Sequence, residues 1–172
     1  VDVGSPPELI QRHVEPVAVE LDCAIEDEAA FLAATGAPKH LRSGNRLSTD
    51  NGRTWTIRLK KGIQFAPDPA FKGKPRELVA DDFIYSLKRL ADPRIRSPWA
   101  FLVDGKFVGL DEEIAAAKKS GRFDYDRKIA GMEAVDRHTL RFRLKATDYN
   151  LPNVLAHEPT SAVAREVIEA YS

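Results

Sequence analysis

Cysteine, methionine, long apolar runs and excess charge are all scarce in this sequence. The chain of 172 residues contains one cysteine and one methionine. Its 26 Lys and Arg residues balance 26 Asp and Glu residues, so no net field draws it towards nucleic acid or an anionic membrane. No run of about 18 apolar residues is present, and no basic segment followed by an apolar one opens the chain. We therefore expect a soluble chain with one domain and no nucleic-acid partner.

The single cysteine excludes an internal disulfide framework. Cys23 lies in the apolar segment VAVELDCAI, with no Lys, Arg or His beside it to activate the thiol. A buried, unreactive core residue is the better interpretation. Secretion stays compatible with this composition, because a domain of this size is stable without disulfides.

Residue groups that would indicate catalysis or metal binding are absent as well. The histidines are scattered singly along the chain: His13, His40, His138 and His157. No HExxH or CxxC motif is present, no GxGxxG or GxxxxGK loop could hold phosphates, and no GxSxG elbow carries a nucleophile. The acidic pairs at 81–82 and 112–113 stand at expected helix starts, where they stabilise the helix dipole. We therefore expect neither an enzyme nor a cofactor or metal site.

What the sequence does contain is two strand patterns with a period of two. Within 53–60 and 139–145, apolar residues alternate with Arg, Lys and Thr. We expect both segments to be strands whose apolar side chains enter one core: Trp55, Ile57, Leu59, Leu140, Phe142 and Leu144. A turn at Asn51-Gly52 precedes the first segment, and a partner strand around 131–135 precedes the second. We therefore expect each segment to be part of an antiparallel hairpin. Their charged faces are typical of a solvated sheet surface.

The clearest helix pattern spans residues 81–91. Apolar residues form one stripe on it: Phe83, Ile84, Leu87, Leu90 and Ala91. Acidic residues at its start, basic residues at its end and the following Pro93 mark the helix limits. Tyr85 projects roughly opposite the stripe, so packing into the same core does not explain it.

Other elements complete the expected fold. We expect a short strand at 17–21 and helices at 25–34, 111–120 and 163–171. Gly121 ends the helix at 111–120. Helices and antiparallel hairpins together indicate an α+β fold, in which a small sheet packs against helices.

Several stretches, in this order, resemble the family 5 extracellular solute-binding proteins, the peptide-, nickel- and haem-type receptors of ABC transporters. They are NGRTWTIRLKKGIQF, ADDFIYSLKRLADP, RSPWAFL, IAGMEAVDRHTLRFRLK and AVAREVIEAYS. The resemblance covers about residues 47–172, and residues 1–46 match the family poorly. It implies a single domain over 1–172 that forms the peripheral subdomain of the first lobe in a larger two-lobed protein of the periplasmic-binding-protein type. Where such relatives have a capping Thr, this chain has Val79, so that helix start is expected to be less well capped.

The resemblance also implies a function. The chain would be part of the substrate-binding component of an ABC importer, capturing a peptide or similar small solute outside the cytoplasmic membrane. The protein would lie in the periplasm or outside the cell, with or without a membrane anchor. Its partners would be the solute and the transporter permease, and solute binding would need the second lobe. Tyr85, Trp99 and Arg96 match positions that face the ligand cleft in relatives.

Two alternatives remain open at this point. Similar domains also occur as solute sensors fused to cytoplasmic transcription regulators, although this chain shows no helix-turn-helix of its own. A hydrolase outside the family is the other alternative, and a clustered nucleophile and base would indicate it.

Overall fold

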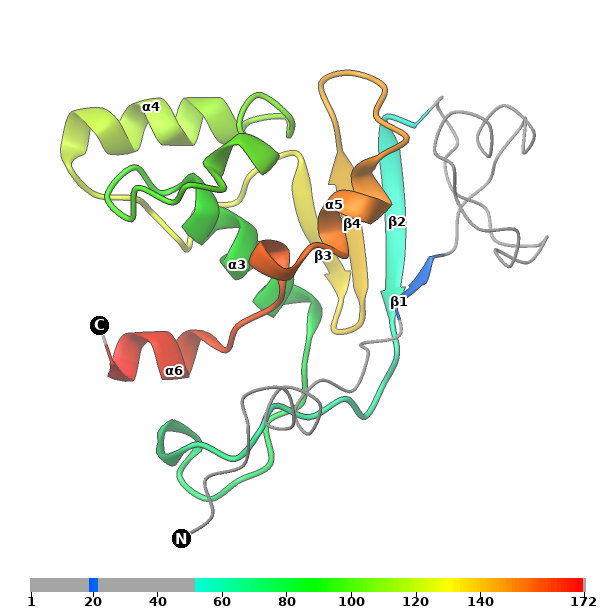
Figure 1. The fold of residues 1–172 in the computed structure, drawn as a ribbon, viewed down its shortest axis with the longest axis vertical. Helices are drawn as coiled ribbons and strands as arrows, with labels where there is room; N and C mark the ends of the chain where they lie inside the picture. Colours follow the sequence, from blue (N-terminus) through cyan, green and yellow to red (C-terminus); the bar gives the residue numbers. More distant parts are fainter. Residues whose placement is uncertain (1–18, 22–51, 172) are drawn as a thin grey trace, which may run out of the picture.

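The computed structural model describes residues 52–171 and, for the backbone only, residues 19–21. Its strands form one antiparallel sheet in the order β1-β2-β4-β3 (Figure 1). The strand bounds are β1 Val19–Leu21, β2 Thr54–Leu59, β3 Met132–Asp136 and β4 Thr139–Arg143. The predicted helix at 25–34, Cys23 and the residue before Gly52 in the expected turn lie outside the described residues.

The two strands predicted from alternation are neighbours in this sheet. β2 pairs with β4, with Ile57 opposite Leu140 and Trp55 opposite Phe142. All six alternating apolar side chains are buried, which confirms the prediction. β3 and β4 form the predicted second hairpin, and β2 pairs with β1 on one side and β4 on the other; the residues before Gly52 that would complete the first hairpin lie outside the described residues. Each strand buries its apolar face in the same core, and this fixes the register in which β2 and β4 pair.

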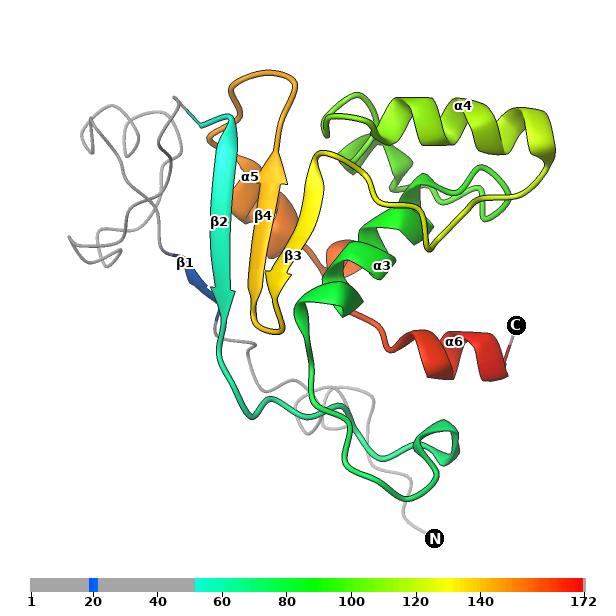
Figure 2. The ribbon, with the colours of Figure 1, turned by 180° about the vertical axis from the view of Figure 1, so that it is seen from behind.

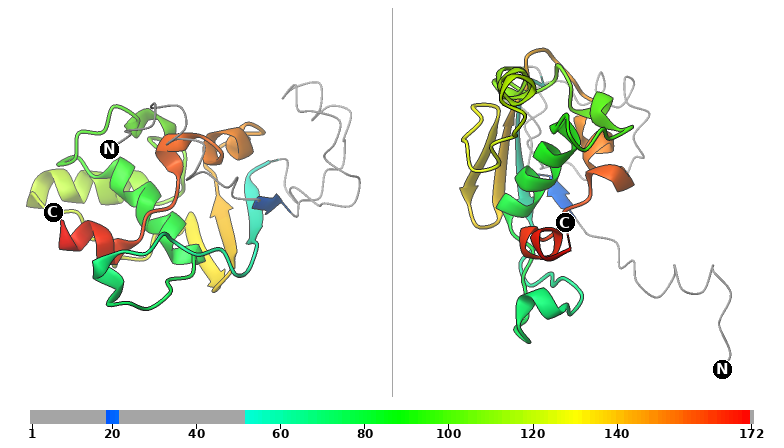
Figure 3. Two further views of the ribbon diagram at one scale, coloured as in Figure 1. Left: turned by 60° about the horizontal axis from the view of Figure 1, so that its bottom comes forward. Right: turned by 90° about the vertical axis from the view of Figure 1, so that its left-hand side faces the viewer.

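The helices cover one side of the sheet. Their bounds are α3 Ala80–Ala91, α4 Leu110–Ser120, α5 Leu151–Leu155 and α6 Arg165–Ala170. Short 3-10 turns lie at η1 Pro69–Phe71, η2 Ala100–Leu102 and η3 Glu158–Thr160. The strands stand to one side of the helices in the right-hand view of Figure 3, and from behind the sheet lies in front of α5 (Figure 2). The predicted α+β architecture is confirmed, and the helices predicted at 111–120 and 163–171 correspond to α4 and α6.

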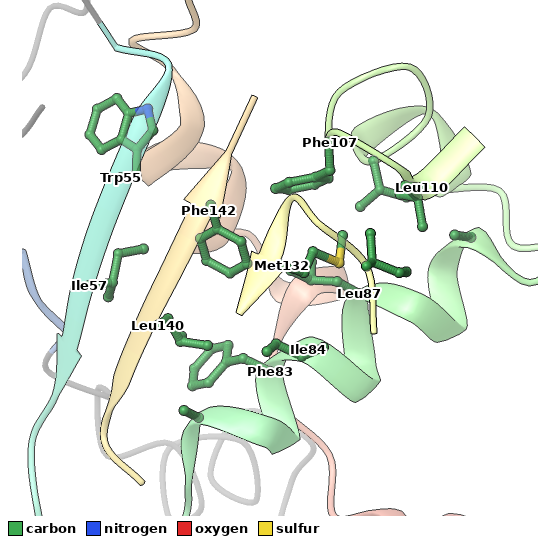
Figure 4. Close-up of a cluster of buried hydrophobic side chains, with 14 of the residues drawn as sticks. Trp55, Ile57, Phe83, Ile84, Leu87, Phe107, Leu110, Met132, Leu140 and Phe142 are labelled. Atoms are coloured by element: carbon green, nitrogen blue, oxygen red, sulfur yellow. The ribbon is translucent and has the colours of Figure 1, made fainter. Parts of the chain in front are cut away.

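The core lies between the sheet and α3. Phe142 on β4 packs against Phe107, with 5.4 Å between ring centroids, and Leu87 of α3 is fully buried beside them (Figure 4). The predicted burial of Phe83 and Leu87 is confirmed. Leu90 is only half-buried, because it lies at the last turn of α3, where the helix leaves the sheet.

An acidic side chain compensates for the missing cap of α3. Val79 makes no side-chain capping bond, as its chemistry requires, but the Val79 backbone N–H donates to Asp82 Oδ2 at 2.8 Å. Asp82 is buried and also accepts two hydrogen bonds from Arg76, at 2.7 and 3.1 Å. Asp82 therefore links the start of α3 to the preceding loop.

The same loop is linked to the tip of the β3–β4 hairpin through Glu77. Its carboxylate accepts hydrogen bonds from the backbone N–H of Gly62 and from Arg137, and it lies 3.1 Å from His138 Nε2. The Gly62 N–H first, then Arg137 and His138, lower the pKa of Glu77 from 4.5 to about 2. Since the folded-state pKa lies below the unfolded one, the stability that these bonds contribute is complete above about pH 4.5 and is lost as the pH falls towards 2.

We therefore expect Glu77→Gln to reduce the acid sensitivity of folding. Urea unfolding at about pH 6 and about pH 3 should show a smaller loss of unfolding free energy for this variant than for the unsubstituted chain. Glu112→Gln, at an exposed position on α4, is the control and should keep the original pH dependence. Equal pH dependence for the Glu77 variant and the parent chain would contradict the assignment.

Candidate functional site

The loop after α3 is built around one buried carboxylate. Asp92 is 1% exposed and accepts hydrogen bonds from the Arg94 backbone N–H at 2.9 Å, the Arg94 guanidinium at 3.0 Å and the Tyr125 hydroxyl at 2.7 Å. Burial alone would raise the pKa of Asp92, but the bonds from Arg94 and Tyr125 outweigh it and lower this pKa overall. The carboxylate stays ionised and fixes where the chain turns after the helix.

A buried ammonium group fixes the neighbouring segment. Lys88 on α3 is 5% exposed, and its Nζ donates to the backbone carbonyls of Tyr125 at 2.8 Å and Arg127 at 2.7 Å. Burial lowers the pKa of Lys88, against the opposing effect of nearby carboxylates that include Asp124. Segment 125–127 is therefore held against the helix from which the loop departs.

Arg96 stands in this loop in an unusual backbone conformation. Its φ is 51°, in the left-handed region that non-glycine residues seldom adopt. The side chain is exposed and makes no hydrogen bond or ion pair with any described residue. It lies at the edge of an open hollow of roughly 280 Å³ between the loop and α4, whose lining includes Leu90, Ile114 and Lys118. Lys72, at the end of η1, has a similar φ of 53°, so this conformation alone does not mark Arg96 as a ligand contact.

Trp99 follows three residues later at the surface. It is 39% exposed, and its ring lies 5.9 Å from that of Phe101 and 5.3 Å from that of His157. Trp99 and Phe101, which are both exposed, form what we call the aromatic patch. Among the described residues the Trp99 indole N–H has no acceptor, whereas that of Trp55 donates to Gly52 O at 2.8 Å.

Tyr85 lies away from the main core, as its helical position predicts, but it is covered. Its ring packs against Tyr125 at 5.2 Å, and the Arg165 guanidinium lies 5.6 Å from its centroid. Only 9% of Tyr85 is exposed, so its ring does not lie on an open face, and burial raises the pKa of its hydroxyl. That hydroxyl makes no hydrogen bond within the described chain and reaches solvent.

One segment contacts both aromatic residues. Residues 157–165, which we call the strap, run across α3 from α5 to α6 (Figure 1). His157 contacts Trp99 at one end, Arg165 covers Tyr85 at the other, and between them the Val163 N–H donates to Ser86 Oγ at 2.8 Å. The strap therefore connects two of the three residues predicted from the sequence, and Arg96 shares the loop of Trp99.

Sequence reasoning missed the strap residues His157 and Arg165. In the sequence His157 is one of four histidines scattered singly along the chain, and Arg165 is part of a predicted terminal helix. The one weak signal in the sequence is Ser86, a polar residue next to Tyr85 on the helix. In the structure its hydroxyl accepts a hydrogen bond from the strap.

The arrangement suits non-covalent binding. Aromatic faces, an indole N–H, a tyrosine hydroxyl and a guanidinium can stack on a solute and form hydrogen bonds with it. Within residues 52–171, no group of three or more His, Cys, Asp or Glu side chains is placed to hold a metal ion. No described helix is long and apolar enough to cross a bilayer.

Comparisons with known proteins identify the chain. Residues 43–170 match the model of the bacterial extracellular solute-binding proteins, family 5 Middle. The periplasmic oligopeptide-binding protein OppA of Escherichia coli is 31% identical over 77% of this chain and 22% of its own length. The periplasmic murein peptide-binding protein MppA of Escherichia coli is 36% identical over 56% of the chain and 16% of its own length.

A solved structure, OppA of Burkholderia pseudomallei, superposes on 72% of the chain and 22% of its own length with a TM-score of 0.54 at 20% identity, which shows the shared fold. The chain thus spans about a fifth of the length of these relatives. With the family model matched over most of the described residues, this chain belongs to the bacterial extracellular solute-binding proteins of family 5.

Proposed function

We propose that this chain is part of the substrate-binding component of an ABC importer and that the intact protein captures a peptide or similar small solute. Membership of the solute-binding family supports a binding function and not turnover. Two of the relatives that it resembles are named as binding proteins for oligopeptides and for murein peptides, which supports a peptide as the solute.

The observation that carries this proposal is a set of polar groups without partners. The Trp99 indole N–H, the Tyr85 hydroxyl and the Arg96 guanidinium form no hydrogen bond with any described residue. Residues that only support the fold differ: the Trp55 indole donates to Gly52 and the Tyr125 hydroxyl donates to Asp92. Arg96 and Trp99 are exposed and the Tyr85 hydroxyl reaches solvent, so a solute can take the place of water at these groups.

A peptide fits the chemistry of these groups. The Trp99 face offers a rigid apolar contact for a side chain, and its N–H can donate to a backbone carbonyl of the solute. The guanidinium of Arg96 suits a carboxylate, from a peptide C-terminus or an acidic side chain, because it can donate two parallel hydrogen bonds. Both residues stand in the loop whose start is fixed by the hydrogen bonds between Asp92 and Arg94, so the loop is held before the solute arrives.

The remaining parts of the proposal concern the larger protein. We infer a two-lobed receptor in which this chain supplies the peripheral part of the first lobe and a second lobe closes over the solute. The receptor would act outside the cytoplasmic membrane, in the periplasm or at the cell surface, and would deliver its solute to a permease. Support comes from the periplasmic relatives and from the small fraction of their length that this chain covers.

Calorimetric titration of the intact receptor with short peptides tests the proposal. Trp99→Ala should weaken peptide binding by about 1 kcal/mol or more, which is roughly fivefold in Kd, because it removes an anchoring aromatic contact. Tyr171→Ala is the matched control, since Tyr171 is 67% exposed and lies outside the aromatic patch.

Two results would contradict the proposal. The first is equal affinity of the Trp99 variant and the unsubstituted receptor. The second is failure of the receptor to bind any member of a peptide set that varies in length, charge and apolar side chains. Turnover of a peptide in the same titration, seen as product by mass spectrometry, would favour the hydrolase alternative.

A further inference from the structure

Helix α6 and the end of the strap form a cover over Tyr85. The Arg165 guanidinium lies 5.6 Å from the centroid of the Tyr85 ring, and this residue begins α6. The ring is 9% exposed, yet its hydroxyl has no hydrogen-bond partner among the described residues. Arg165 thus shields the face of the ring, whereas the Tyr85 hydroxyl still reaches solvent.

The cover is tied down by charged groups. Arg165 forms ion pairs with Asp126 and Glu169, each with 2.5 Å between the nearest nitrogen and oxygen. Glu166 pairs with Arg76 at 2.9 Å, and Arg76 in turn pairs with the buried Asp82 at the start of α3. Most of these side chains are substantially exposed, so salt screens their attraction.

Within the described part of the chain, α6 has no buried residue of its own. The helix has six residues, Arg165–Ala170, and no side chain caps its N-terminus. A helix this short is marginal without tertiary contacts, and its packing is mainly against η1 (Figure 1). By contrast, the preceding part of the strap is anchored by the buried Ala164 and by the bond from Val163 to Ser86. Among the described residues, burial therefore ends at Ala164, directly before Arg165.

We propose that α6 is an ionic latch in which Arg165 controls access to Tyr85. With the latch closed, the guanidinium covers the ring; when the ion pairs of Arg165 and Glu166 open, the ring face becomes available to solute beside the hydroxyl, which already reaches solvent. Arg165 acts through Tyr85 and is a positioning residue. Contact between the uncovered ring and solute rests on the proposed function. The latch itself does not depend on that function.

The location of the charges favours opening at Arg165. Its partner Asp126 lies in the segment that Lys88 holds against α3, so that half of the pair stays in place. On the N-terminal side of Arg165, the strap is fixed by the hydrogen bond from Val163 to Ser86. Rotation of α6 about residues 164–165 would then move Arg165 off the ring without disturbing the core, since Ala164 is the last buried residue before the chain's described end.

Nitration of tyrosine by tetranitromethane, with peptide mass spectrometry as readout, tests the latch in the full chain. Arg165→Gln should increase the nitration rate of Tyr85 by about two- to fivefold, the effect expected for losing exposed ion pairs. Raising the salt concentration should speed Tyr85 nitration in the unsubstituted chain and change it much less in the variant. Arg165→Lys, which keeps the charge, should restore much of the protection.

Two controls make the outcome decisive. Arg137→Gln removes an exposed ion pair with Glu77 in another part of the fold and should leave Tyr85 unchanged. Tyr125, whose hydroxyl is bonded to Asp92, should stay protected in every variant. Equal Tyr85 rates with and without Arg165 would overturn the latch, as would parallel increases at Tyr85 and Tyr125, which indicate general loosening.

The latch and the proposed function fail separately. If Arg165→Gln exposes Tyr85 but Tyr85→Phe leaves peptide affinity unchanged, the latch stands and the role of Tyr85 in binding is wrong. If Tyr85→Phe weakens binding while Arg165→Gln leaves nitration unchanged, the ligand contact stands and the latch is wrong.

Discussion

Replacing Phe142 by alanine is expected to lower the free energy of unfolding by about 3–5 kcal/mol, the usual cost of removing a buried aromatic ring. Phe142 is fully buried on the central strand β4, opposite Trp55 of β2 and Met132 of β3. Its ring lies 5.4 Å from that of Phe107. Because strands flank it on both sides, the surrounding structure has little freedom to collapse into the cavity.

Phe101→Ala is the matched control for this prediction. Phe101 is 65% exposed, so the same chemical change should alter the unfolding free energy by about 0.5 kcal/mol or less. Urea unfolding followed by circular dichroism measures both variants. A loss below about 1 kcal/mol for Phe142→Ala would contradict the described core. A large loss for Phe101→Ala would show that the aromatic patch is buried in solution.

Asp92→Ala is expected to cost about 2–3 kcal/mol of unfolding free energy, since it removes a buried acceptor of several hydrogen bonds. The Tyr125 hydroxyl would lose its partner beside the core, whereas Arg94 is largely exposed and can be hydrated. The estimate is therefore set below the cost of breaking a fully buried ion pair. Asp104→Ala, at an exposed position of the same region, is the control and should be nearly neutral.

The pH dependence gives this prediction a second readout. The folded-state pKa of Asp92 is lowered, so its stabilising effect is present above the ordinary pKa of an aspartate and is lost as the pH falls through the lowered value. The stability difference between Asp92→Ala and the unsubstituted chain should thus be largest near neutral pH and shrink in acid. A difference that stays constant into acid, or grows, would contradict the hydrogen-bonded carboxylate.

The sequence predicts the elements that follow a simple period. Alternation in 53–60 and 139–145 locates β2 and β4 and the face that each buries, because one-residue shifts would place every apolar side chain in water. The stripe on 81–91, with its charged ends and Pro93, locates α3 to within one residue. The resemblance to the solute-binding family adds the order of these pieces.

Pairing between distant strands is harder to predict. Nothing local in the pattern of β2 states that its partner is β4, some 80 residues later, and not a strand just before it. The pairing depends on which apolar faces share the core, which is a property of the whole chain. The bulge between Ala134 and Asp136 likewise follows from fitting β3 to β4 and has no clear local signal.

The candidate site was predictable in part for a related reason. A helical wheel shows that Tyr85 leaves the apolar stripe, but the cover above it comes from Arg165, 80 positions later in the chain. The helical wheel predicts the direction in which the Tyr85 side chain projects, but it does not predict which residue packs against it. For Arg96 and Trp99 the sequence offers only the resemblance, because backbone strain and an unused indole N–H are visible in coordinates alone.

The two indole N–H groups of the chain provide the most direct test of the proposed binding surface. The sequence contains two tryptophans, so a ¹⁵N-correlated NMR spectrum of this chain shows two assignable indole signals. One of them, Trp55, is buried and bonded to Gly52 and serves as an internal reference; the other, Trp99, is partly exposed and lacks a partner in the described chain. Addition of short peptides at high concentration should shift the Trp99 signal and leave Trp55 in place. If both signals move together, or if Trp99 does not move and Trp99→Ala also leaves the peptide affinity of the intact receptor unchanged, Trp99 does not form a binding surface for peptide.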